Sequence, residues 1–144
     1  MSSNPRYDDP QLLMQTYKKI LLVDDDIDDR LIFRQVLEEI DKGINLECAE
    51  NGVEMTRLLE ELPNNSLPEL IVLDQNMPVM TGKESLQLLK QHPRYAHIPI
   101  IIYSTVQDRD FFLECRELGV MDVVSKPDTL QSYRDMLRQF LAQE

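Results

Sequence analysis

The chain has 144 residues, of which 42% are hydrophobic and 28% charged, as expected for one ordinary globular domain with a single sizeable core. Its 26 acidic residues outnumber 15 basic ones, giving a formal net charge of −11 at pH 7. This charge repels nucleic-acid phosphates and anionic lipid, which argues against nucleic-acid and membrane partners. No apolar run is long enough to span a membrane, and the N-terminus lacks the apolar stretch of a signal peptide, so we expect a cytoplasmic location.

Composition divides the chain into a short extension and one domain. Residues 1–17 contain serine, asparagine, two prolines and an Asp-Asp pair, which favours a flexible N-terminal extension. Residues 18–144 form one candidate domain without repeats or linkers. The two cysteines, Cys48 and Cys115, lie far apart in apolar segments and are expected to be buried, reduced thiols.

Short apolar runs alternate with amphipathic segments through this domain. Strands are predicted over residues 20–23, 44–49, 70–73, 100–103 and 120–124. Hydrophobic residues at helical spacing predict helices over residues 32–40, 53–62, 86–90, 111–118 and 130–141. Five strands alternating with five helices indicate an α/β fold, a doubly wound parallel sheet with helices on both faces.

Polar side chains follow several of the predicted strands at their carboxyl ends. Asp24 and Asp25 follow the first strand, Asp74 the third, Ser104 the fourth and Lys126 the fifth. Asp74 alone is better explained as a residue that caps or turns the chain. Because parallel strands end at one sheet edge, where open α/β sheets bind ligands, we expect these residues to converge. Three clustered carboxylates oppose one another's ionisation unless a cation joins them.

Oxygen ligands of this kind suit Mg²⁺, with Mn²⁺ as the alternative. With the metal in place, Asp74 can accept a phosphoryl group as an acyl phosphate. The metal, the Lys126 ammonium and the Ser104 hydroxyl would stabilise the phosphoryl oxygens. The nucleophile is already a carboxylate, so no general base is required.

Four motifs resemble the receiver domain of two-component response regulators. They are Val23-Asp24-Asp25, Leu73-Asp74-Gln75-Asn76-Met77-Pro78 with Gly82, Ile102-Tyr103-Ser104, and Ser125-Lys126-Pro127. Each motif alone is weak, but all four occur in order and at strand ends. The resemblance covers about residues 19–143 and implies a flavodoxin-like strand order 2-1-3-4-5.

The resemblance also implies a role for each matching residue. Asp74 is the phosphoacceptor, Ser104 the switch hydroxyl and Lys126 the partner of the phosphoryl group. Asp25 and Asp74 ligate Mg²⁺ directly, Asp24 ligates it through water, and Asn76 through its backbone carbonyl. The implied donor is a phosphohistidine on a sensor histidine kinase or a histidine phosphotransfer protein.

The resemblance further implies a phosphorylation-dependent switch or phosphorelay intermediate, not an enzyme apart from its own phosphorylation and dephosphorylation. We expect no fused output domain, so output is expected through a downstream protein partner or onward relay. A homodimer formed through the last two helices is a further expectation of the family.

Two positions depart from the family pattern. The switch aromatic expected three residues before the lysine is Val123, so hydroxyl movement is not coupled to a rotating ring there. Val106 occupies a position where polar groups orient attacking water, and we expect its apolar side chain to slow loss of the phosphoryl group. Tyr103, next to the switch hydroxyl, is expected to be partly exposed.

Three further acids open the first predicted helix. Asp26, Asp28 and Asp29 are interpreted as capping residues that favour the positive end of the helix. Arg30 is interpreted as a surface residue or a partner of these acids.

Two other functional classes remain open. A metal-dependent aspartyl phosphatase usually needs an acid two residues after its nucleophile, but Asn76 occupies that position. An unphosphorylated interaction module is the second alternative, although it would not need the complete set of acids, hydroxyl and lysine.

Overall fold

The computed structural model describes residues 17–105 and 108–142. In chain order the elements are β1 (Lys19–Val23), α3 (Ile27–Ile40), β2 (Asn45–Ala49), α4 (Gly52–Glu61), the short 3₁₀ turn η1 (Asn64–Ser66), β3 (Leu70–Asp74), α5 (Gly82–Gln91), β4 (Ile100–Ser104), α6 (Arg109–Glu117), β5 (Asp122–Ser125) and α7 (Leu130–Ala142). The predicted alternation of strands and helices is confirmed over these residues.

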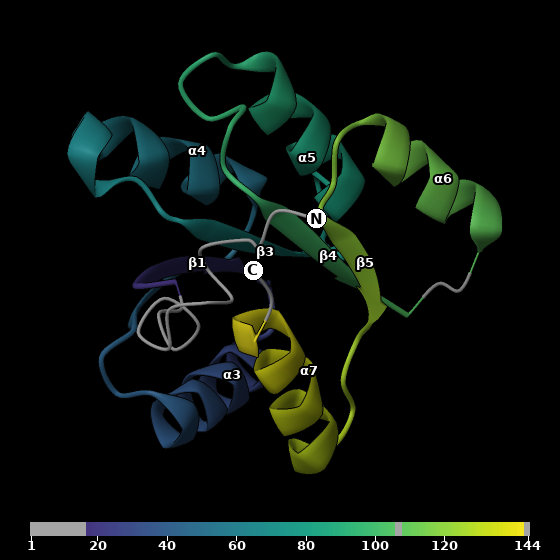
Figure 1. Ribbon diagram of the computed structural model, residues 1–144. Coiled ribbons are helices and arrows are strands. Elements are labelled where there is room, and N and C mark those ends of the chain that lie inside the picture. Colours follow the sequence, from purple (N-terminus) through teal and green to yellow (C-terminus); the bar gives the residue numbers. More distant parts are fainter. Residues whose placement is uncertain (1–16, 106–107, 143–144) are drawn as a thin grey trace, which may run out of the picture.

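The five strands form one parallel sheet in the order β2-β1-β3-β4-β5. This is the predicted 2-1-3-4-5 order of a doubly wound fold. In Figure 1, α4, α5 and α6 lie on one side of the sheet, and α3 and α7 lie side by side on the other. The sheet is therefore the middle of three layers.

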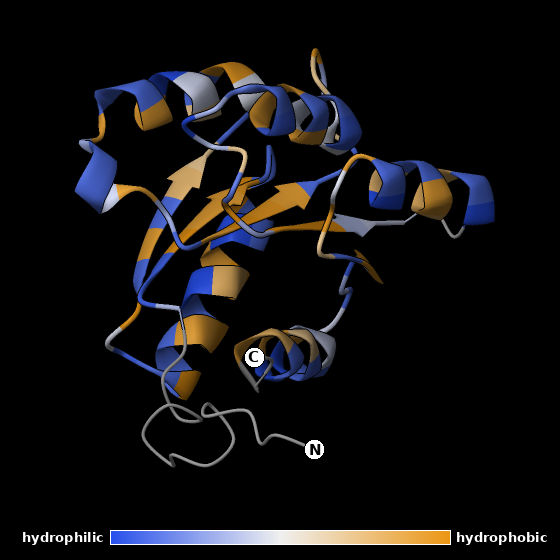
Figure 2. Cartoon of the chain, turned by 45° about the horizontal axis from the view of Figure 1, so that its top comes forward, coloured by the Kyte–Doolittle hydropathy of each residue, from blue (hydrophilic) through white to orange (hydrophobic). Residues whose placement is uncertain are grey.

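Each strand alternates its side chains between two hydrophobic clusters. Leu22, Val72 and Tyr103 belong to the cluster that includes Phe33 of α3 and Phe140 of α7. The second cluster joins the intervening strand residues to α4, α5 and α6; it includes Leu21, Leu73, Ile102, Met55, Leu86 and Cys115. Figure 2 shows mostly hydrophobic strands between helices that carry both hydrophobic and hydrophilic residues. Burial on both faces explains why the strands read as continuous apolar runs.

Several boundaries differ from those predicted. The first long helix begins at Ile27 because Asp26 caps it, accepting the backbone N–H groups of Asp28 and Asp29. The predicted end of that helix at Ile40 is confirmed, with Asp41 as its C-cap. The 3₁₀ turn after Pro63 was not predicted, and β5 begins at Asp122, two residues later than Val120.

The remaining structural predictions concern the two cysteines, membrane-spanning helices and the N-terminal extension. Cys115 is buried and Cys48 half-buried, and both are free thiols. Within the described part of the chain, no helix has the length and apolar character needed to cross a membrane. The predicted extension lies outside the described residues except for Tyr17, which packs against the α3–α7 cluster.

Candidate phosphoacceptor and metal site

Strand register brings the acidic residues together. Val23 of β1 pairs with Leu73 of β3, so Asp24 and Asp74 follow on neighbouring strands at the same sheet edge. Asp74 in turn pairs with Tyr103 of β4, and Ser104 pairs with Ser125 of β5. Asp24, Asp74 and Ser104 are all fully buried. The sequence-predicted convergence at this edge is thus present.

Asp74 closes β3 and is held through both carboxylate oxygens. Its Oδ1 accepts the backbone N–H of Asn76 at 3.0 Å, and its Oδ2 accepts the Lys126 ammonium at 3.0 Å. Gly82 opens α5 directly above this strand end. A Cβ at Gly82 would lie 2.7 Å from the Asp74 carbonyl oxygen and 2.9 Å from the Cα of Gln75. Glycine therefore allows α5 to begin against the backbone of Asp74.

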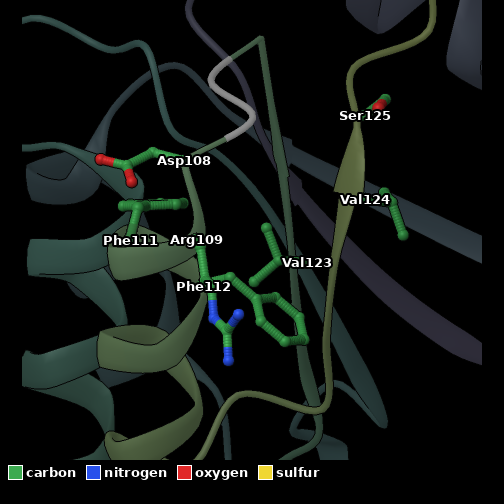
Figure 3. Close-up of a pocket in the computed structure, with 7 residues that line it drawn as sticks. All are labelled: Asp108, Arg109, Phe111, Phe112, Val123, Val124 and Ser125. Carbon is green, nitrogen blue, oxygen red and sulfur yellow. The ribbon is translucent and has the colours of Figure 1, made fainter.

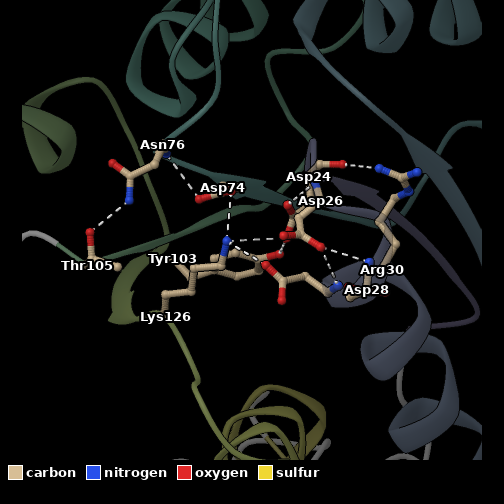
Figure 4. A network of polar contacts seen from close by, with 10 residues as sticks. Asp24, Asp26, Asp28, Arg30, Asp74, Asn76, Tyr103, Thr105 and Lys126 are labelled. Carbon is tan, nitrogen blue, oxygen red and sulfur yellow. Dashed lines mark hydrogen bonds and ion pairs between the residues drawn. The ribbon is translucent and has the colours of Figure 1, made fainter.

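Lys126 lies among three carboxylates (Figure 4). Its Nζ is 3.0 Å from Asp74 Oδ2, 2.9 Å from Asp29 Oδ2 and 3.7 Å from Asp24 Oδ2. The contact with Asp29 was not predicted, because Asp29 had been interpreted only as a helix-start acid. Asp29 lies in the first turn of α3, which follows the β1 strand end directly, and this position is the signal in the sequence that could have indicated the contact.

Asp24 is bound by donors on both oxygens. The backbone N–H of Asp26 donates to Oδ1 at 3.0 Å, and the Tyr103 hydroxyl donates to Oδ2. The expectation that Tyr103 is partly exposed was wrong, since its side chain is fully buried. Side chains alternate along a strand, so Tyr103 points to the α3–α7 face and away from the face of Ile102.

Asp25 completes a set of carboxylates that fits a metal ion. One oxygen from each of Asp24, Asp25 and Asp74 can be chosen so that all three lie within 4.8 Å of one another. Asp25 is exposed, while the other two are buried, so the group opens to solvent on one side. An all-oxygen donor set with room for water is the kind that Mg²⁺ prefers.

Burial dominates the electrostatics of the site. Desolvation raises the pKa of Asp24 to about 6 against the hydrogen bonds from Tyr103 and Asp26. Desolvation also raises the pKa of Asp74, although Lys126 lowers it. Burial alone would lower the pKa of Lys126, but its contacts with Asp29 and Asp74 raise it above the usual value. The lysine is therefore a permanent cation, and the surrounding acids are left with an excess of negative charge.

The other predicted site residues surround this cluster. Asn76 is exposed and donates from its side chain to Thr105 Oγ1 at 2.8 Å. The carbonyl of Ser104 accepts the backbone N–H of Lys126 at 2.9 Å. This bond holds the backbone that follows β5 against the end of β4. Arg30 donates to the Asp24 carbonyl oxygen at 2.7 Å and pairs with Glu50. Arg30 thus supports the backbone of Asp24 instead of its acidic neighbours.

Val123 lies in β5, where the family has an aromatic residue. It is half-buried and lines a cavity of about 330 Å³ between β5 and α6. Phe112 of α6 lies beside it, and Phe111 also lines the cavity (Figure 3). An aromatic ring is therefore present at this face, but it comes from the helix. Val106, the second departure, lies outside the described residues.

Comparisons with known proteins identify the family of this chain. The family model of the response regulator receiver domain matches residues 20–138. A protein-glutamate methylesterase/protein-glutamine glutaminase of Bacillus licheniformis is 35% identical in an alignment 127 residues long, which covers 83% of this chain and 33% of that protein. The chain thus spans about a third of the length of the first curated relatives that it matches.

Other relatives are matched over most of their length. Response regulator Rcp1 of Synechocystis sp. is 30% identical over 124 residues, 84% of each chain. A structure of the Mn²⁺-bound form of Rcp1 has a TM-score of 0.74 at 30% identity, covering 85% of this chain and 90% of that one. The phosphorylated cyanobacterial phytochrome response regulator RcpA has a TM-score of 0.76 at 27% identity, with the same coverage. The family match over residues 20–138 and these likenesses show that the chain belongs to the response regulator receiver domain family.

Proposed function

We propose that this receiver domain is a phosphorylation-dependent switch or phosphorelay intermediate whose phosphoacceptor is Asp74. The observation that carries the proposal is the pairing of the buried Asp74 with Lys126, 3.0 Å apart, beside the carboxylates of Asp24 and Asp25. A buried carboxylate is desolvated and nucleophilic, and the adjacent ammonium compensates the charge that a phosphoryl group brings.

The transfer would proceed by displacement at phosphorus. A carboxylate oxygen of Asp74 forms the new P–O bond while the P–N bond of a phosphohistidine breaks. The imidazole nitrogen keeps the electron pair of that bond and takes a proton from solvent. Lys126 stabilises the phosphoryl oxygens as a point charge, and we assign the Ser104 hydroxyl to a further oxygen.

Mg²⁺ is the proposed cofactor, with Mn²⁺ as the alternative. Asp25 and Asp74 would hold it directly, Asp24 through water and Asn76 through its backbone carbonyl. When bound, the ion supplies positive charge where the transferred group develops negative charge. The assignment is supported by the oxygen-only donor set and by the Mn²⁺-bound form of the relative Rcp1.

The proposed donor is a sensor histidine kinase or histidine phosphotransfer protein, and the proposed output is a protein partner. Asp24 is bound on both oxygens, and Asn76 replaces the acid that a phosphatase places two residues after its nucleophile. These features favour a stable acyl phosphate over turnover of phosphomonoesters.

Intact-mass measurement after incubation with Mg²⁺ and acetyl phosphate tests the proposal. We expect wild-type protein to gain the mass of one phosphoryl group, and expect Asp74→Asn or addition of EDTA to abolish the gain. Asp28→Asn is the matched control, because it removes an exposed carboxylate from the first turn of α3. That carboxylate does not cap the helix.

Two outcomes would redirect the proposal. Rapid release of inorganic phosphate from phosphomonoesters, dependent on Asp74, would indicate a phosphatase. Absence of any adduct with acetyl phosphate, with phosphoramidate and with a phosphorylated histidine phosphotransfer protein would indicate an interaction module.

A further inference from the structure

The hydrogen bond between Tyr103 and Asp24 is not used by the proposed transfer. Tyr103 lies on β4 and Asp24 at the end of β1, two strands that are separated by β3. Both side chains are fully buried, and the hydroxyl of Tyr103 donates to Asp24 Oδ2 (Figure 4). The bond therefore crosses beneath Asp74 and ties one acid of the site to the strand that carries Ser104.

Tyr103 also supports the lysine of the site. The Lys126 ammonium lies over its ring, 5.3 Å from the centroid, within the range of a cation–π contact. The same ammonium is 3.7 Å from Asp24 Oδ2, the oxygen that accepts the tyrosine hydroxyl. The Tyr103 hydroxyl and the Lys126 ammonium thus both lie near Asp24 Oδ2, and the hydroxyl is the group that donates a hydrogen bond to it.

A second buried tyrosine shows that this contact is particular to Tyr103. Tyr133 of α7 belongs to the same hydrophobic cluster and is 2% exposed. Its hydroxyl lies near Asp29 and makes no hydrogen bond to Asp24. Burial and the nearby carboxylates of Asp29 and Asp24 raise the pKa of Tyr133, but it is the Tyr103 hydroxyl, and not that of Tyr133, that donates to Asp24.

We propose that Tyr103 is a positioning residue of the metal site, whose hydroxyl fixes the orientation of Asp24 and keeps Lys126 from occupying Asp24 Oδ2. Without the hydroxyl, the carboxylate is free to rotate, and the Lys126 ammonium, 3.7 Å away, can take over the oxygen that the hydroxyl occupied. The metal must then order the carboxylate and displace the lysine from it. Groups that orient ligands in this way typically change metal affinity by one or two orders of magnitude.

This inference rests on the proposed function, because it takes the metal to bind at Asp24, Asp25 and Asp74. The test measures Mn²⁺ binding to unphosphorylated protein by electron paramagnetic resonance of the free ion, a readout that needs no turnover. We expect Tyr103→Phe to raise the Kd on the order of tenfold. Tyr133→Phe, which removes a buried hydroxyl from the same cluster, is the matched control and should leave the Kd unchanged.

Two further measurements separate positioning from a general loss of structure. In an Asp24→Asn background, Tyr103→Phe should have no further effect on the Mn²⁺ Kd, because the hydroxyl acts through that carboxylate. Phosphorylation by acetyl phosphate should slow in Tyr103→Phe at low Mg²⁺ and return to the wild-type rate at saturating Mg²⁺. A purely structural role would lower the rate at both concentrations.

Unchanged Mn²⁺ affinity in Tyr103→Phe would overturn the inference while leaving the proposed function intact. An equal loss of affinity in Tyr103→Phe and Tyr133→Phe would also overturn it. If wild-type protein itself bound no Mn²⁺, both the inference and the proposed metal site would fail.

Discussion

At the scale of single residues, the site is defined by how one lysine is shared. Lys126 is as close to Asp29, at 2.9 Å, as to Asp74, at 3.0 Å. Asp29 belongs to α3 and Asp74 to β3, so the ammonium joins two elements in the unphosphorylated protein. A phosphoryl group on Asp74 adds negative charge on one side of this arrangement. We expect the lysine to leave Asp29 when Asp74 is modified.

Removal of Asp29 should therefore favour phosphorylation. In Asp29→Asn, Lys126 is released toward Asp74 and the repulsion of an anionic donor is reduced. An interaction of about 1 kcal/mol at this partly exposed position corresponds to a rise in rate on the order of fivefold. The measurement is the initial rate of adduct formation with acetyl phosphate at fixed Mg²⁺.

Asp28→Asn removes the same charge from the same helical turn without touching Lys126, and serves as the control. Equal rates for the two variants would show that the effect is one of net charge and that sharing of the lysine has no role.

Val79 follows the phosphoacceptor strand in a strained conformation. Its φ is 70° and its side chain is 90% exposed, and a β-branched residue pays about 1–2 kcal/mol for left-handed backbone. Asparagine tolerates this region, so Val79→Asn should raise the free energy of unfolding by about 1 kcal/mol. Urea denaturation measures the change.

Val53, which is 61% exposed at the start of α4, provides the comparison. Its φ is not positive, so Val53→Asn should bring no stabilisation. A loss of stability in Val79→Asn would contradict the assignment of strain to Val79.

Much of the site was predictable residue by residue from the strand ends. Asp24, Asp25, Asp74, Ser104 and Lys126 were each expected at the edge where they lie. The contacts of Asp29 and Tyr103 were not, because they depend on which face of a helix or strand turns toward the acids. Tyr103 was expected to be partly exposed, and nothing in its apolar run indicates which carboxylate its hydroxyl would meet.

At the scale of elements, the approach of α5 to β3 positions the phosphoacceptor. Helix α5 is fixed at its start by a capping box between Thr81 and Glu84, and Gly82 lets its first turn contact the backbone of Asp74. Gly82→Ala places a methyl group 2.7 Å from the Asp74 carbonyl oxygen. The strand end and helix must separate, which should cost about 1–3 kcal/mol of stability and slow phosphorylation.

Gly43→Ala is the control for this prediction. A Cβ there meets a side-chain oxygen of Asp41 at 3.2 Å in an exposed turn, so stability and phosphorylation should change little. Urea denaturation and adduct formation measured on both variants decide the matter; wild-type behaviour of Gly82→Ala would show that α5 does not position Asp74.

Element boundaries were less predictable than element types. Asp26 begins α3 earlier than the first apolar residues at helical spacing, because its side chain caps the helix. The 3₁₀ turn at Asn64–Ser66 rests on tertiary contacts, since Arg94 from the α5–β4 connection donates to Asn64 and to the carbonyl of Leu59. A contact between segments 30 residues apart in sequence has no local signal.

At the scale of the whole molecule, buried acids oppose the stability of the metal-free fold. Burial raises the pKa of Asp24 from 3.8 to about 6, so the folded protein binds more protons at Asp24 than the unfolded chain. The contribution of Asp24 to stability is fully present below pH 3.8 and is lost as the pH rises through about 6.

Metal-free wild-type protein should therefore lose stability relative to Asp24→Asn between pH 4 and pH 7. The loss reaches at most roughly 3 kcal/mol, since a change of one in pKa corresponds to about 1.4 kcal/mol. Urea denaturation at several pH values measures the difference between the two proteins.

Addition of Mg²⁺ should restore the stability of wild-type protein above pH 6, where Asp24 is ionised, and should affect Asp24→Asn less. A stability difference between the two proteins that does not depend on pH would contradict the proposed burial of the Asp24 charge.

The central claim is that Asp74, and no other carboxylate of the cluster, becomes the acyl phosphate. Borohydride reduces an aspartyl phosphate to homoserine, so treatment of the modified protein followed by tandem mass spectrometry identifies the acceptor directly. We predict homoserine at position 74, formed only with Mg²⁺ present. Homoserine at position 24 or 25, or an adduct that survives in Asp74→Asn, would contradict the account.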